Sequence, residues 1–119
     1  MLTTTLIALI AALHLWIMVM EMFLWTTPRV RRSFGTTAEF ATATKVLAAN
    51  QGLYNGFLAA GLIWALMAGP QGAGAAPAGF FLGCVLLAGI FGAATASRRI
   101  LYVQALPAAM ALLALAFRL

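Results

Sequence analysis

Long apolar runs alternate with short polar segments along this chain of 119 residues. At about 1.5 Å of rise per residue, runs of about 20 residues match a hydrocarbon layer of about 30 Å. The pattern predicts four helices, at residues 2–25, 37–68, 78–96 and 99–117. We therefore expect one domain over residues 1–119, an all-α membrane bundle of four up-and-down transmembrane helices.

Turn and cap signals separate these helices. The Thr-Thr-Pro sequence at 26–28 ends the first helix, and Thr-Thr-Ala-Glu at 36–39 resembles a capping box that opens the second. Residues 69–74, rich in Gly, predict a flexible turn, and Ser-Arg-Arg at 97–99 predicts a tight basic turn. Pro107 predicts a kink in the fourth helix.

Composition agrees with a membrane protein. The chain is 65% hydrophobic and 8% charged, with a mean hydropathy of +1.04, which leaves too little polar surface for a water-soluble domain. Cys84 is the single cysteine, so a disulfide within the chain is excluded. One His and two acidic residues are too few for a metal site, and we predict none.

The net charge of +5 is distributed unevenly. Because the cations flank apolar runs, we interpret them as determinants of membrane orientation and not as a nucleic-acid surface. Six of the seven lie on one side of the predicted bundle: Arg29, Arg31, Arg32, Lys45, Arg98 and Arg99. The positive-inside rule predicts a multi-pass protein of the inner membrane, with these residues in the cytoplasm and both termini outside. Arg118 is the exception.

Polar residues gather in the cytoplasmic half of three predicted helices. His14 and Glu21 are seven residues apart and share a helix face. The second helix carries two adjacent rows with i,i+4 spacing, which form one polar arc whose first turn is level with Glu21. The predicted ligand-binding set is His14, Glu21, Asn50, Gln51, Tyr54, Asn55, Arg98, Arg99, Tyr102 and Gln104. Gly52 and Gly56 lie beside the arc and predict the close approach of a neighbouring helix.

Burial makes this set informative. A carboxylate in hydrocarbon costs several kcal/mol or is neutralised, so Glu21 needs a partner, and Lys45, Arg98 and Arg99 are candidates. Amides need several hydrogen bonds each, which a polar pocket or a ligand supplies. The alternatives are a structural salt bridge for Glu21, a backbone carbonyl partner for His14, interhelical bonding for the amides and interfacial anchoring for Tyr102.

Four stretches resemble a known family. They are HLWIMVMEMFLW at 14–25, ANQGLYNGF at 49–57, GIFGA at 89–93 and QALPA at 104–108. On these motifs the chain is similar to domain-of-unknown-function family 1304, a group of small four-helix bacterial membrane proteins. The likeness covers nearly the whole chain and carries no established activity.

A more distant likeness is to the MAPEG superfamily of eicosanoid and glutathione proteins. These four-helix chains form trimers, with an Asn-x-x-Glu-Asn pattern on helix two and Ala-Arg-x-x-Tyr at the start of helix four. Gln51-Gly-Leu-Tyr54-Asn55 and Arg99-Ile-Leu-Tyr102 resemble these patterns. Tyr54 replaces the acid, Gln51 replaces the Asn, and Leu47 stands where an arginine is usual. The likeness therefore implies the architecture and a homotrimer, while the departures argue against glutathione as a ligand.

Three functions follow from these features. The leading hypothesis is a MAPEG-like homotrimer with a polar pocket near the cytoplasmic side, which binds a lipid-like or amphipathic anionic ligand. In it, Arg98 and Arg99 hold the head group, and Tyr54, Tyr102 and Glu21 are candidate catalytic groups; the sequence does not decide whether there is catalysis. The alternatives are a small proton-coupled multidrug-type transporter that uses Glu21, and a non-catalytic membrane scaffold.

Overall fold

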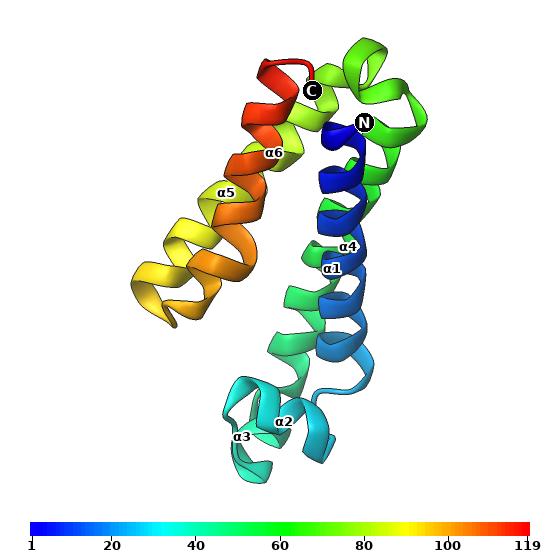
Figure 1. Cartoon of the computed structure of the whole chain (residues 1–119). Helices are drawn as coiled ribbons and strands as arrows, with labels where there is room; N and C mark the ends of the chain where they lie inside the picture. Colours follow the sequence, from blue (N-terminus) through cyan, green and yellow to red (C-terminus); the bar gives the residue numbers. More distant parts are fainter. The chain divides into compact units, whose positions relative to one another are not determined.

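A computed structural model describes all residues, 1–119, and every regular element in it is helical (Figure 1). The elements are α1 (Leu2–Phe23), α2 (Pro28–Phe34), α3 (Ala38–Ala43), α4 (Lys45–Met67), the π-helical segment η1 (Gly69–Ala73), α5 (Ala75–Thr95), the π-helical segment η2 (Leu101–Ala105) and α6 (Leu106–Ala116). The all-α prediction is confirmed. By length and composition, two of these helices, α1 and α5, can cross a membrane.

The chain divides into two compact units. One contains Met1–Ala12 and Leu58–Leu119, and the other contains Leu13–Phe57. The helices α1 and α4 each contribute residues to both units.

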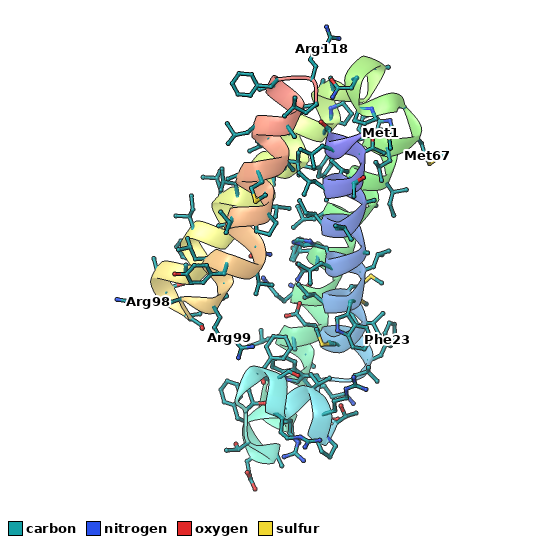
Figure 2. All side chains as sticks on the ribbon, viewed as in Figure 1. Met1, Phe23, Met67, Arg98, Arg99 and Arg118 are labelled. Atoms are coloured by element: carbon teal, nitrogen blue, oxygen red, sulfur yellow. The ribbon has the colours of Figure 1, made fainter.

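The first unit has an apolar core formed by α1, α4, α5 and α6. Buried positions on α5 recur at Ala78, Leu82, Val85 and Gly89, the three-and-four spacing of a single helix face. A methyl group on Gly89 would lie 2.6 Å from the backbone nitrogen of Ala105, so the backbones of α5 and η2 are in contact there. At its other end the unit is closed by hydrogen bonds among Thr3, Gln71, Arg118 and Leu119. Figure 2 shows Arg98 and Arg99 at the opposite end of this unit from Met1 and Arg118.

The second unit pairs the end of α1 with the start of α4, and α2 and α3 connect them (Figure 1). Ala48, Gly52 and Asn55 are buried on α4, again with three-and-four spacing. On α1, His14 and Glu21 are buried. The two helices thus meet along one narrow seam that contains polar residues.

The structure corrects the predicted helix at residues 37–68 in two respects. Residues 37–68 are not one helix: α3 ends at Ala43, and α4 begins at Lys45. The hydroxyl of Thr44, between them, donates to the carbonyl of Phe40, an alternative to regular helical bonding that threonine favours. Thr37, and not Thr36, is the N-cap, since its Oγ1 accepts the Phe40 N–H at 3.1 Å, so no capping box forms.

The fourth predicted helix changes register before Pro107. The Leu106 N–H donates to the carbonyl of Leu101, five residues earlier, which is the π-helical pattern of η2. Proline has no N–H to donate to the carbonyl of Val103, so a regular α-helical ladder is interrupted at this point in any case. The predicted kink therefore takes the form of a π-helical turn that precedes regular α6.

Candidate functional site

A buried carboxyl–amide pair joins α1 to α4. Nδ2 of Asn55 donates to Oε1 of Glu21 at 2.7 Å and to the backbone carbonyl of Gln51 at 3.2 Å. Glu21 is 8% exposed and Asn55 9% exposed. The Glu21 partner in this unit is therefore an amide, and not the cation Lys45 that the sequence offered as a candidate.

Two glycines let the helices come this close. A methyl group on Gly52 would lie 3.0 Å from Cβ of Glu21 and 3.2 Å from the carbonyl oxygen of Met18. One on Gly56 would lie 2.7 Å from the Met18 sulfur. The predicted close approach at these glycines is confirmed.

The geometry also explains why Asn55 is the residue that meets Glu21. Gly52 touches Cβ of Glu21, so Glu21 is level with the first turn of the polar segment, as predicted. Asn55 lies about one turn further along α4. Side chains lean toward the N-terminus of their own helix, so on these antiparallel helices the two lean toward each other and close that offset.

The polar arc on α4 turns away from the seam. Asn50 and Gln51 are exposed, and Tyr54 is 55% exposed, with its ring edge-on to Phe57 at 5.9 Å. Of the four predicted polar residues on α4, only Asn55 therefore reaches α1. The sequence held a signal for this, since Asn55 has the spacing of the small residues Ala48 and Gly52 that form the seam.

His14 is fully buried and lies on the same face of α1 as Glu21, as the spacing of seven predicts. Met18 lies between them, against Gly56. Across the 119 residues, no group of three or more His, Cys, Asp or Glu side chains comes together that could hold a metal ion.

The remaining predicted residues belong to the first unit. Arg98 and Arg99 are exposed in the turn after α5, where the Arg99 N–H donates to Oγ of Ser97 at 3.3 Å. Tyr102 lines an open groove of about 300 Å³, and Gln104 is half-buried in η2. The other lining residues are Leu86, Ile90, Leu101, Ala105, Leu106 and Ala109. A single site that combines these groups with Glu21 and Asn55 stays a prediction.

An ordered helical cap that the sequence pattern did not predict connects α1 to α4. Trp25 holds it: its Nε1 donates to Oγ1 of Thr44 at 3.1 Å, and its ring meets Phe34 edge-on at 5.0 Å. The signals for α2 were present, with Pro28 at its first turn and Gly35 following it at φ 66°.

Comparison with known proteins gives one family. No curated protein and no solved structure matches the chain. The family described as "Protein of unknown function (DUF1304)" matches residues 8–116, a range that includes both units and all six α-helices in whole or in part. This confirms the family predicted from the motifs, and the chain belongs to the DUF1304 family.

Proposed function

We propose that the protein is a multi-pass inner-membrane protein of four spans that assembles as a MAPEG-like homotrimer and binds a lipid-like or amphipathic anionic ligand at the outer face of α4. The membrane part of the proposal is supported by exposed apolar surface. On α5, Phe80, Leu87 and Phe91 are each about two-thirds exposed or more, and 22% of the most apolar stretch of that helix is buried. A soluble monomer rarely exposes such a continuous apolar surface, whereas lipid covers it without cost.

The observation that carries the ligand and the assembly is the polar face of α4. Asn50, Gln51 and Tyr54 point outward, flanked by the exposed apolar side chains of Leu53 and Phe57. In lipid, each uncovered amide would cost several kcal/mol. We therefore propose that a sister subunit or a polar ligand head group covers this face.

The trimer and the charge of the ligand have separate support. The Gln51-Gly-Leu-Tyr54-Asn55 motif occupies the place of the helix-two pattern of the MAPEG trimers, which is a fold-level analogy. Seven Lys and Arg against two Asp and Glu favour an anionic head group. Asn50 and Gln51 would orient it through their amide N–H groups, and the Tyr54 hydroxyl is placed to donate a hydrogen bond beside them.

The test is to purify the full chain in mild detergent, measure the protein mass of the particle, and identify retained small molecules by native mass spectrometry. We expect three copies and a retained amphipathic anion. The N50A/Q51A double variant should lose the anion and weaken assembly, because interhelical amide bonds contribute about 0.6 to 2 kcal/mol each.

Thr95→Ala is the matched control. Thr95 is also an exposed polar residue on a long helix, but its hydroxyl bonds to the Phe91 carbonyl of its own helix. The control should leave mass and retained ligand unchanged. A monomer, a dimer, or an unaltered N50A/Q51A particle would contradict the proposal, and a trimer that holds no ligand would favour the scaffold.

The transporter remains the second candidate because of the buried Glu21, whose partner is a neutral amide. A carboxyl group in this setting can exchange a proton without breaking an ion pair. If it does so, Glu21→Gln abolishes proton-coupled efflux of cationic dyes from cells that express the protein. Unchanged efflux in that variant, or none with the native chain, removes this candidate.

A further inference from the structure

The helical cap, residues 25–44, is a small folded element of its own. Val30 and Ala41 are 2% and 0% exposed and form its core. The contacts of Trp25 with Phe34 and Thr44 fix both of its helices, and Gly35 makes the left-handed turn that reverses the chain between them. The cap therefore presents a defined surface and not a loose loop.

The outer surface of the cap is cationic. Arg29 and Arg32 are exposed, one helical turn apart, and neither forms a hydrogen bond or an ion pair through its side chain. Arg31, partly buried, donates from Nε to the Thr26 carbonyl at 3.2 Å. Glu39 is the one acidic residue in the cap, so most of this charge has no counterpart in the cap itself.

The cap and the first residues of α4 also expose aromatic and aliphatic side chains. Phe34 is 42% exposed and Phe40 53%, and Val46 and Leu47, at the start of α4, are 81% and 71% exposed. Exposed guanidinium groups and exposed aromatic rings in one short folded segment fit the boundary of a membrane, where rings enter the acyl region and cations meet phosphate. The cap also follows directly after α1, which is long and apolar enough to cross a membrane.

We infer that the cap is a docking surface for anionic phospholipid, with Arg29 and Arg32 on the head-group phosphates and Phe40 among the upper acyl chains. The inference rests on the membrane location proposed above and adds a lipid class to it. Charge complementarity selects the occupant: zwitterionic lipid would leave the two arginines without a net countercharge, whereas an anionic leaflet supplies one.

The experiment uses Trp25 as a reporter inside the cap. Trp16 and Trp64, which are 46% and 59% exposed, are changed to Phe so that Trp25 is the single tryptophan. The full chain is reconstituted in phosphatidylcholine vesicles that contain, at equal mole fractions, either dibrominated phosphatidylglycerol or dibrominated phosphatidylcholine. Titration of each brominated lipid gives its relative association constant near Trp25.

We expect brominated phosphatidylglycerol to quench Trp25 more strongly, and R29Q/R32Q to remove that preference. Each cation near an anionic surface contributes about a five-fold attraction at low salt, so losing two should lower the relative association constant by about 30-fold. The control is Arg118→Gln, which removes an exposed arginine outside the cap and should retain the preference. The hydrogen bond from Nε1 of Trp25 to Oγ1 of Thr44 involves none of the substituted residues. Equal melting temperatures of the variants and the parent protein verify that the fold is unchanged.

Each of the other outcomes contradicts a specific part of the proposal. Equal quenching by the two lipids in the native chain, or a preference that survives R29Q/R32Q, overturns the docking surface and leaves the membrane location intact. A preference lost when inorganic phosphate is added at constant ionic strength assigns the cap to free phosphate and overturns the lipid surface. Quenching by neither lipid contradicts the membrane location itself.

Discussion

At the scale of single residues, the contact between Glu21 and Asn55 is the most specific polar feature of the protein. The amide uses both of its N–H groups, one on the carboxyl oxygen and one on its own helix. The carboxyl group therefore acts as an acceptor in a buried position, and no cation in this unit pairs with it. Acceptor and charge can be separated by mutation.

Glu21→Gln is expected to change the free energy of unfolding little, because the glutamine oxygen can still accept from Asn55. Glu21→Ala removes the acceptor and should cost about 1–3 kcal/mol, the penalty for an unsatisfied buried donor. Thermal melting in detergent micelles measures the stability of both variants. The control is Glu39→Ala at an exposed position, which should change the free energy of unfolding by no more than about 0.5 kcal/mol. An equal loss of stability in Glu21→Gln and Glu21→Ala would show that the charge of the carboxylate itself is needed.

At the scale of elements, glycines decide where helices touch. The GxxxG patterns at 52–56 and 79–83 look alike in the sequence, yet only the first is tightly packed: a methyl group on Gly79 would lie 4.0 Å from Leu115 of α6, an ordinary contact. Around Gly83 there is nothing within 4 Å of an added methyl group, and at Gly89 the obstacle is the backbone of Ala105. A small residue therefore marks a close contact only when its phase places it on the buried face.

Three glycine-to-alanine variants should follow this order. Gly89→Ala should be the most destabilising, because the Ala105 backbone cannot move aside as the flexible Met22 side chain beside Gly52 can. Gly52→Ala should be intermediate. Gly83→Ala should gain up to about 1 kcal/mol from helix propensity. Melting temperatures in one detergent rank them, and a Gly83→Ala loss equal to that of Gly89→Ala would contradict the packing described here.

The contacts of Trp25 with Phe34 and Thr44 lead to a second prediction at this scale, on the stability of the cap. Trp25→Ala removes the ring contact with Phe34 and the bond to Thr44, so the cap should open and trypsin should cut faster at Arg29 and Arg32. Trp25→Phe keeps an aromatic ring, so its cleavage rate should lie between those of the native protein and Trp25→Ala. Trp64→Ala, which removes an exposed tryptophan from α4, is the control. Equal cleavage rates in all four proteins would mean that the contacts of Trp25 do not stabilise the cap.

These elements also show how far the sequence was predictive. Apolar run length and the spacing of seven were sufficient to locate the long helices, though not the break at Thr44, and to predict the shared face of His14 and Glu21, because both depend on helix geometry alone. The division of the amides, with Asn55 inward and Asn50 outward, depends on which face of α4 meets α1, and that is a tertiary choice. The cap was missed because an arginine-rich segment resembles a loop unless its Pro and Gly boundaries are read together.

At the scale of the whole molecule, the number of membrane crossings is the main question. Only α1 and α5 have the length and apolar character of spans by themselves; α4, with 23 residues, contains the polar arc, and Leu101–Ala116 is shorter. A polar helix can still cross a membrane when its polar face is covered by protein or ligand. Four crossings and the proposed assembly around α4 therefore depend on each other.

Cysteine labelling separates four crossings from two. In a Cys84→Ala background, single cysteines are placed at Ser33, Ala73 and Ser97, all of them exposed between the long helices. With four crossings, Ser33→Cys and Ser97→Cys lie on the cytoplasmic side, with the basic residues, and only Ala73→Cys reacts with an impermeant maleimide in intact spheroplasts. With α1 and α5 as the only spans, positions 33 and 73 share a side and react alike. That result would place α4 outside the bilayer, where its exposed amides are solvated by water and require neither a ligand nor a sister subunit.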